Sequence, residues 1–418
     1  MPHDTLLVNA NDVDAAADRL AGRITRTPLT YSERLSTACN AQVWLKREDL
    51  QQVRSYKGRG ATNFIAQLTE AQQRAGVVCA SAGNHAQGVA FACAQLGVAA
   101  RIYLPRTTPR QKRDRVAAIG GPFVEIVVGG ETYDAAAASA AAHAEGAQLT
   151  LVPPFDHPMT IAGQGTMVRE IMQDMVEPPD VIVVPVGGGG LIAGASTYLH
   201  AHYPHVRIVG AEPSGAASMA AALAAGGPVM LPEVDAFVDG AAVRRVGDVT
   251  FPLVRAAGAE LVSVPEGRIC VEMLALYQTE GIVAEPAGAL APAALDQLGI
   301  EPGQRVVAVL SGGNNDVLRY AEVMERALVH EGRKHYFLVN FPQEPGALRR
   351  FLDDVLGPDD DIALFEYTKR NNREIGPALV GIELGSPGDL GPLMERMRAS
   401  SVNVEQIPPD SPMFRFIL

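Results

Sequence analysis

Lys57 is the residue with the clearest chemical potential in this sequence of 418 residues. It lies in the stretch SYKGRGA, residues 55–61, after a polar approach that includes Glu48 and Asp49. We predict that a short turn holds this lysine just before a helix that begins near Gly60. A free lysine has a pKa near ~10.4, so its amine acts as a base at neutral pH only when it is buried or lies beside another cation. A solvent-exposed lysine is the alternative, but the glycine-rich loops further along the chain favour a phosphorylated ligand near it.

Four consecutive glycines follow an apolar strand that we expect at residues 180–185. Such a run lets the backbone approach an anion with its N–H groups turned inward, at the positive end of the next helix. The spacing does not fit a dinucleotide fingerprint, and no Gly-Lys-Ser or Gly-Lys-Thr follows it. A structural turn without a ligand is the alternative. The predicted anion loop comprises Gly187, Gly188, Gly189, Gly190 and Leu191.

Two more strand ends carry small and polar residues: SAGNHAQG at 81–88 and SGGNND at 311–316. Parallel sheets bind ligands at the carboxyl ends of their strands, which is where both stretches fall. Helix capping by Ser81 or Asn84 is the alternative for the first stretch, and a cap is the alternative for Ser311. We expect His85 to be a packed ring and give it no part in the chemistry.

The order of these four stretches resembles the threonine dehydratases of the tryptophan-synthase-β group (fold type II) of pyridoxal-phosphate enzymes, over roughly residues 5–325. The resemblance implies that Lys57 binds pyridoxal 5'-phosphate covalently and then removes the proton from the substrate's Cα. It implies that the glycine loop holds the phosphate, that Asn84 meets the phenolic oxygen and that Ser311 meets the ring nitrogen. It also implies that Glu285 lies near the ring and that a single turn binds the substrate carboxylate. That turn consists of Ser81, Ala82, Gly83, Asn84 and His85.

Ser311 bears on the type of reaction. A hydroxyl cannot keep the ring nitrogen protonated as a carboxylate would, and weak electron withdrawal suits β-elimination better than transamination or racemisation. Serine racemases of this group carry a second serine where this chain has Ala82, so we expect dehydration without racemisation. Small residues are expected to line a pocket for a substrate the size of threonine or serine: Ala82, Gly83, Gly163, Gly240 and Ala241.

The elements around these residues alternate between strand and helix, which predicts an α/β fold with parallel sheets. The resemblance implies a catalytic domain at 1–325 with a smaller subdomain inserted at about 45–150. A linker is expected at 326–334, followed by a domain at 335–409 and a tail at 410–418. The βαββαβ order of the later domain is that of a ferredoxin-like α+β unit, and its turn at 341–348 resembles ACT-like amino-acid-sensing domains.

Four local predictions accompany this fold. Asp12 or Asn11 is expected to cap the first helix, and apolar spacing predicts one amphipathic helix over 61–74. A small strand is expected at 282–284, just before Glu285, and another strand at 362–371.

Composition excludes several classes of protein. Apolar residues make up 47% of the chain and charged residues 20%, which indicates a globular protein and not a disordered one. The net charge of −12, without a basic run, argues against a nucleic-acid partner. The sequence shows no signal peptide, membrane span or metal-ligand pattern, so we expect a cytoplasmic protein that binds neither membrane nor metal. We expect free thiols at Cys39, Cys79, Cys93 and Cys270.

The resemblance therefore implies dehydration and deamination of L-threonine, and more weakly of L-serine, to 2-oxobutanoate and ammonia. The C-terminal unit implies the biosynthetic form at the start of isoleucine synthesis. Isoleucine is the expected inhibitor and valine a second candidate effector. A homodimer or homotetramer is implied as well. Threonine synthase and cysteine-synthase-type β-replacement enzymes are the rivals within the fold, and a cofactor-free amino-acid sensor is the rival outside it.

Overall fold

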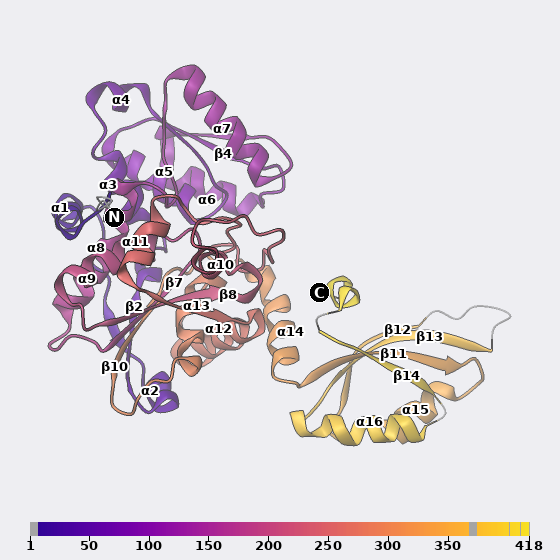
Figure 1. Ribbon diagram of the computed structural model, residues 1–418. Coiled ribbons are helices and arrows are strands. Elements are labelled where there is room, and N and C mark those ends of the chain that lie inside the picture. Colours follow the sequence, from indigo (N-terminus) through magenta and orange to yellow (C-terminus); the bar gives the residue numbers. More distant parts are fainter. Residues whose placement is uncertain (1–6, 368–373, 401, 410, 418) are drawn as a thin grey trace. The chain divides into compact units, whose positions relative to one another are not determined.

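The computed structural model describes residues 7–367, 374–400, 402–409 and 411–417. The chain divides into two units, Met1–Asp316 and Val317–Leu418 (Figure 1). The first unit ends nine residues before residue 325, where the sequence predicted the end of the catalytic domain. The limits of the functional domains remain a prediction. The expectation of an α/β catalytic part followed by an antiparallel C-terminal part is confirmed.

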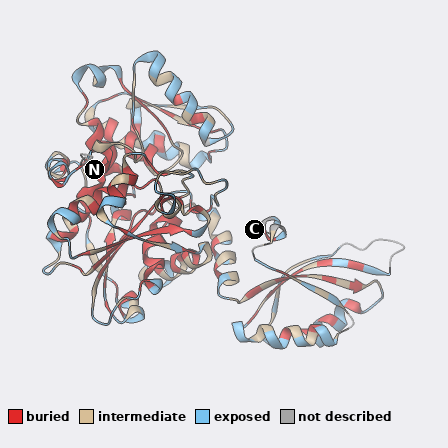
Figure 2. Cartoon of the chain, in the orientation of Figure 1, coloured by how far each residue is buried: buried red, intermediate tan, exposed pale blue. Residues whose placement is uncertain are grey.

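The large sheet of the first unit has the strand order β1-β2-β10-β7-β8-β9, and all neighbouring strands are parallel except β1 and β2. Every residue of β7 is buried, as expected of a parallel strand covered on both faces (Figure 2). The strands are β1 Leu29–Tyr31, β2 Gln42–Arg47, β7 Val181–Pro185, β8 Arg207–Pro213, β9 Glu260–Val264 and β10 Arg305–Leu310. Its helices are α1 Ala10–Leu20, α2 Glu33–Cys39, α8 Pro158–Asp174, α9 Gly190–His202, α10 Ser218–Ala225, α11 Thr250–Ala257, α12 Glu266–Glu280 and α13 Pro286–Ala293.

A second, smaller sheet in the same unit has the order β5-β4-β3-β6 and is entirely parallel. Its strands are β3 Val77–Ala80, β4 Ala100–Leu104, β5 Val124–Val128 and β6 Thr150–Leu151. The helices between them are α5 Asn84–Leu96, α6 Arg110–Gly120 and α7 Tyr133–Ala147. The predicted alternation of strand and helix is therefore confirmed in both sheets.

The three local predictions for this unit are wrong. Asn9, not Asn11 or Asp12, caps α1, and the Asp12 carboxylate completes the capping box from the third helical position. The single helix expected over 61–74 is two helices, α3 Lys57–Ile65 and α4 Glu70–Ala75, because Thr69 starts a capping box of its own. Residues 282–284 form no strand, since the Ile282 N–H donates to the Leu276 carbonyl and closes the end of α12.

The first of these helices begins at Lys57 itself. Lys57 therefore lies in the first turn of α3 and not in a turn before a helix at Gly60.

The second unit has the predicted ferredoxin-like order. Its four strands form an antiparallel sheet in the order β12-β13-β11-β14. The elements are α14 Tyr320–His330, β11 Lys334–Pro342, α15 Ala347–Val355, β12 Asp361–Tyr367, β13 Ile375–Glu383, α16 Leu390–Ala399 and β14 Asn403–Ile407. The last part of the strand predicted at 362–371, from residue 368, lies outside the described residues.

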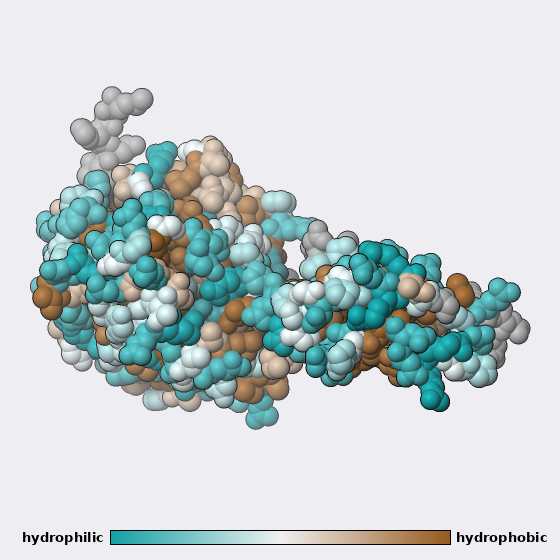
Figure 3. Space-filling view, turned by 90° about the horizontal axis from the view of Figure 1, so that it is seen from below, coloured by the Kyte–Doolittle hydropathy of each residue, from teal (hydrophilic) through white to brown (hydrophobic). Residues whose placement is uncertain are grey.

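The surface drawn in Figure 3 is mostly hydrophilic, with hydrophobic side chains in separate patches. Within the described ranges, no helix is both long and apolar enough to cross a bilayer. Cys79, Cys93 and Cys270 are buried and Cys39 is half-buried, and all four are free thiols, which confirms that prediction.

Three buried charges and a partly exposed one, Glu170, join the large sheet to the helix that carries Lys57. The Arg59 guanidinium donates to the Glu48 carboxylate at 2.8 Å and to the Glu170 carboxylate at 2.7 Å. Lys46, which is fully buried on β2, donates to Glu170 at 2.8 Å. Two cations thus face two anions. Burial alone would raise the pKa of Glu48, but the neighbouring Arg59 guanidinium keeps that pKa below its ordinary value.

Removal of one member should therefore be costly. We expect R59M to lower the free energy of unfolding by about 3–5 kcal/mol, because the Glu48 carboxylate would stay fully buried without its guanidinium partner. Urea unfolding measures the change. The matched control is R74M, whose exposed ion pair with Glu70 should contribute less than about 1 kcal/mol. Equal losses for the two variants would contradict the prediction.

Candidate active site

Lys57 lies at the start of α3, and its amine donates to the Pro154 carbonyl oxygen at 2.9 Å. Loss of water around the amine lowers the pKa of Lys57 to about 8, and the negative charge of Glu285 opposes part of that fall. The side chain is half-buried, so the amine is still accessible to a ligand. A substantial fraction of neutral amine near pH 8 is what a nucleophile or a base at Cα needs.

The end of β10 lies against the residues that precede Lys57. The Tyr56 N–H donates to the Ser311 carbonyl at 3.1 Å, and Ser55 forms a bridge with Gly312. The Ser311 hydroxyl is buried and donates to the Ala287 carbonyl at 3.1 Å. The structure therefore brings Ser311 and the lysine segment together, as the motif order predicted.

The glycine loop fits an anion. It connects β7 to α9, and its residues from Gly188 onwards are buried. Among the described residues, the backbone N–H groups of 187–191 donate to no protein acceptor, although buried N–H groups are almost always paired. Gly189 has φ +93°, and a Cβ at Gly188 would lie 2.5 Å from the Phe155 ring, so glycine is required at both positions. Unpaired N–H groups at a helix N-terminus suit a phosphate.

The turn 81–85 closes β3 and opens α5. The Ser81 hydroxyl accepts the Gly83 N–H at 3.2 Å, while a Cβ at Gly83 would meet open space. The Asn84 amide donates to the Glu285 carboxylate at 2.5 Å. His85 is buried against the Val152 carbonyl, and burial lowers its pKa to about 3, so it is a neutral packed ring as predicted.

Glu285 is a buried carboxylate at the N-terminus of α13. Burial raises its pKa to about 7; Asp239 adds to the rise, and the hydrogen bond from Asn84 opposes it. Gly240 lies beside it, with its Cβ position 3.9 Å from the Glu285 carboxylate, and Ala241 packs against Gly187. Gly240 and Ala241 therefore lie near Glu285 and the glycine loop, and their part in lining a substrate pocket remains a prediction.

Gly163 has a different surrounding from the one predicted. A Cβ there would lie 2.7 Å from the Arg59 carbonyl and from the Asn63 side chain, so it permits α3 to cross α8 closely. Gly88 does the same between α5 and α3, where a Cβ would lie 3.0 Å from the Lys57 backbone. Both glycines position the helix of the lysine; Gly163 does not line the substrate pocket.

Several contacts at the site were missed by sequence reasoning. Phe155 covers the glycine loop, and Thr250 donates to the Gly188 carbonyl at 2.8 Å. Gln164 donates to the same Pro154 carbonyl that accepts the Lys57 amine, and its side-chain oxygen lies 2.5 Å from the Cβ position of Gly190 in the loop. These residues stand alone in the sequence and carry no motif. Asn314 did carry a signal, because it lies within the SGGNND stretch.

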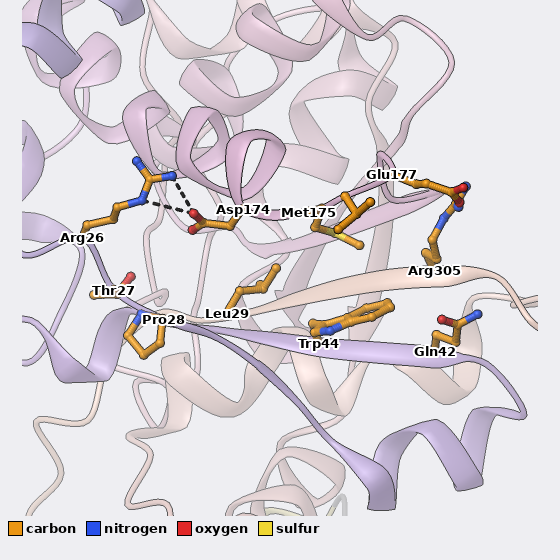
Figure 4. Close-up of a pocket in the computed structure, with 11 residues that line it drawn as sticks. Arg26, Thr27, Pro28, Leu29, Gln42, Trp44, Asp174, Met175, Glu177 and Arg305 are labelled. Carbon is orange, nitrogen blue, oxygen red and sulfur yellow. Dashed lines mark hydrogen bonds and ion pairs between the residues drawn. The ribbon is translucent and has the colours of Figure 1, made fainter.

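A cavity of about 630 Å³ lies elsewhere, along β1, β2 and the end of α8 (Figure 4). Trp44 and Leu29 form its apolar wall, and the Arg26–Asp174 ion pair lies at one end. The predicted site residues do not line it. We assign it no part in the chemistry.

The residues around Lys57 fit pyridoxal phosphate. They offer an amine for its aldehyde, unpaired N–H groups for its phosphate, an amide for its phenolic oxygen and a hydroxyl for its ring nitrogen. This combination can bind an amino acid and remove its Cα proton without a metal ligand set.

The depressed pKa of Lys57 leads to a pH-dependent stability in the cofactor-free protein. Its pKa falls on folding from an ordinary 10.5 to about 8, so below pH 8 the folded state carries the full cost of a desolvated charge. Above 10.5 the amine is neutral in both states and the cost vanishes. We expect K57M to be more stable than the parent by up to about 3 kcal/mol at pH 7, and the gain to disappear above pH 10.5. Urea unfolding across pH measures it; a gain independent of pH would refute the explanation.

Comparisons with known proteins agree with this geometry. A family model described as pyridoxal-phosphate dependent enzyme matches residues 20–312, and one described as the C-terminal regulatory domain of threonine dehydratase matches 325–417. The biosynthetic L-threonine dehydratase IlvA of Mycobacterium tuberculosis is 60% identical over 409 residues, which cover 97% of this chain and 95% of that protein. The corresponding protein of Corynebacterium glutamicum is 54% identical, with coverage of 98% and 95%.

Among solved structures, the processed form of threonine deaminase isoform 2 from Solanum lycopersicum superposes with a TM-score of 0.71 at 36% identity, over 76% of this chain and 94% of that one. Maize serine racemase gives the same TM-score at 31% identity, over 78% and 99%. The first structure is named a threonine deaminase and the second a serine racemase, so the second similarity extends only to the fold. The chain belongs to the biosynthetic L-threonine dehydratases of the pyridoxal-phosphate-dependent enzymes.

Proposed function

We propose that this chain converts L-threonine to 2-oxobutanoate and ammonia, and L-serine more weakly to the corresponding 2-oxo acid, with Lys57 as the base. The observation that carries the proposal is the desolvated Lys57 amine, which donates to the Pro154 carbonyl beside Phe155, the residue whose ring lies against Gly188 of the glycine loop. The reaction removes the Cα proton and the β-hydroxyl, and water then replaces the nitrogen. Its atoms therefore balance without an outside oxidant.

When bound, pyridoxal phosphate supplies an aldehyde for the substrate amine and an electron-withdrawing ring that acidifies the Cα–H bond. Lys57 takes the proton, which its lowered pKa favours. The unpaired N–H groups of 187–191 hold the phosphate, and the turn at 81–85 binds the substrate carboxylate. Ser311 gives the ring nitrogen a neutral partner, and Ala82 leaves the opposite face without a second acid, so the product is a keto acid and not a D-amino acid.

Borohydride reduction followed by peptide mapping tests the role of Lys57. We expect the reduced cofactor on the peptide that contains Lys57, and keto-acid release from L-threonine that falls by at least about a thousandfold in K57A. A cofactor found on another lysine would contradict the assignment of the base. If the protein binds the cofactor but releases no keto acid from threonine or serine, a β-replacement enzyme becomes the better hypothesis. If it binds no cofactor at all, an amino-acid sensor becomes the better hypothesis.

The C-terminal regulatory domain indicates an amino-acid effector. We propose isoleucine as the inhibitor and a cavity of about 450 Å³ in the second unit as its site. The cavity lies between the β11–α15 turn and β12, with Phe341 and Phe365 in edge-on contact at its apolar wall. Leu352 and Tyr367, which also line it, are partly exposed, and this suits a branched aliphatic side chain.

A charge in the apolar wall should weaken inhibition. We expect L352E to raise the isoleucine concentration for half-inhibition by about tenfold or more, with keto-acid release unchanged when isoleucine is absent. The matched control is M413E, which places the same charge at an exposed methionine of the same unit that does not line the cavity. Equal inhibition of L352E and the parent would exclude this cavity.

Two further parts of the proposal need direct measurement. Valine, added in the same assay, shows whether it counteracts isoleucine. Assembly as a dimer or tetramer is measured by sedimentation of the full chain, and a cytoplasmic location remains a prediction of the sequence.

A further inference from the structure

We infer that Asn314 and Glu285 together fix the orientation of the Asn84 side-chain amide, so that Asn84 presents an N–H donor, and not its carbonyl oxygen, to the bound cofactor. The inference rests on the proposed function, in which Asn84 meets the phenolic oxygen. It assigns Asn314 and Glu285 as positioning residues that act through Asn84.

A chain of hydrogen bonds runs across the site. Asn314 donates one side-chain N–H to the Val53 carbonyl at 2.8 Å and the other to the Asn84 side-chain oxygen at 2.7 Å. Asn84 in turn donates to the Glu285 carboxylate at 2.5 Å. Three side chains from three separate parts of the sequence therefore form one directed chain.

The direction of this chain follows from counting donors and acceptors. A side-chain amide has two N–H donors and one oxygen. Asn314 donates one N–H to the Val53 carbonyl oxygen, which cannot donate in return. The NH₂ group of Asn314 is therefore fixed, and its second N–H faces the Asn84 oxygen. If Asn84 were rotated by 180°, its oxygen would face the Glu285 carboxylate and its NH₂ would face the NH₂ of Asn314. Both contacts would be repulsive, so only one orientation satisfies the network.

One N–H of Asn84 remains after this count. The Asn84 side chain is half-buried at the open end of the small sheet, whereas Glu285 is buried behind it. A donor suits an anionic phenolic oxygen, and a carbonyl oxygen in its place would repel it. The network therefore makes Asn84 present a partly positive N–H group, and not a partly negative oxygen, to the phenolic oxygen of the cofactor.

The local sequence of the strand end agrees with this role. A Cβ at Gly312 would lie 2.2 Å from the Glu285 carboxylate, and a Cβ at Gly313 would lie 2.6 Å from the Val283 carbonyl. The two glycines thus let the loop pass close enough to Glu285 for Asn314 to reach Asn84. The Asn314 backbone N–H also donates to Glu285, and this bond opposes part of the rise that burial causes in the pKa of Glu285.

The test compares two adjacent and chemically equal substitutions, N314D and N315D. Both asparagines are half-buried, and both changes replace one amide by one carboxylate in the same loop. Asn314 donates to Asn84, whereas Asn315 donates to the Ala284 carbonyl at 3.2 Å. Each purified apo-protein is titrated with pyridoxal phosphate, and the dissociation constant and the visible absorption maximum of the bound cofactor are measured.

We expect N314D to weaken cofactor binding by about tenfold or more and to shift the absorption maximum, because Asn84 would turn its NH₂ towards the new carboxylate. N315D should stay within about threefold of the parent with an unshifted maximum. Equal affinities and equal maxima for the two variants would overturn the inference.

Two further variants keep the outcome interpretable. If N314D does not fold, E285Q and E285L replace it: glutamine retains an oxygen for the Asn84 N–H and should keep the maximum, whereas leucine should shift it. Identical spectra for E285Q and E285L would also overturn the inference. The variant N84A tests the proposed role of Asn84 separately. An unchanged affinity in N84A refutes that role, whereas a changed N84A beside an unchanged N314D refutes only the positioning by Asn314.

Discussion

The structure depends on a set of charges that cannot be separated once they are buried. Arg59 and Lys46 face Glu48 and Glu170. Loss of one buried partner would lower the free energy of unfolding by about 3–5 kcal/mol. The four residues come from β2, the turn after it, α3 and α8. Because Arg59 is two residues from Lys57 on the same helix, any shift of α3 that moved the amine would also strain these bonds. These ion pairs thus fix the position of α3, and two apolar cores stabilise the sheets next to it.

The site itself is assembled from the carboxyl ends of β3, β7 and β10. Each strand is buried and apolar, and each ends in small residues because a ligand has to approach the backbone there. The remaining links come from contacts between loops: the Pro154 carbonyl receives both Lys57 and Gln164, and Glu285 receives Asn84. Rigid strands set the distances, and the loops determine which atoms face the ligand.

Much of this could be predicted from the sequence because strand ends and glycine runs are local signals. The positions of Lys57, the glycine loop and Ser311 followed from them, as did the βαββαβ order of the second unit. Helix limits were predicted less well: the capping box at Thr69 that divides 61–74 is a weaker signal than the apolar spacing that spans it. Gly163 was misplaced because a glycine that serves helix crossing and one that lines a pocket look alike in sequence. Phe155 and Gln164 reach the site only through tertiary folding.

The close crossings at Gly163 and Gly88 have a consequence for altering this protein by directed evolution. At Gly88 the neighbouring atoms are all backbone atoms of the lysine helix, and at Gly163 they are backbone atoms and the Asn63 Cβ, none of which can move aside as the end of a flexible side chain can. Libraries that vary these glycines would displace the amine in nearly every clone. Gly83 faces open space, so variation there changes the shape offered to a substrate and leaves the lysine in place. The scope for new substrates therefore lies in the turn after β3 and not in the helices beneath it.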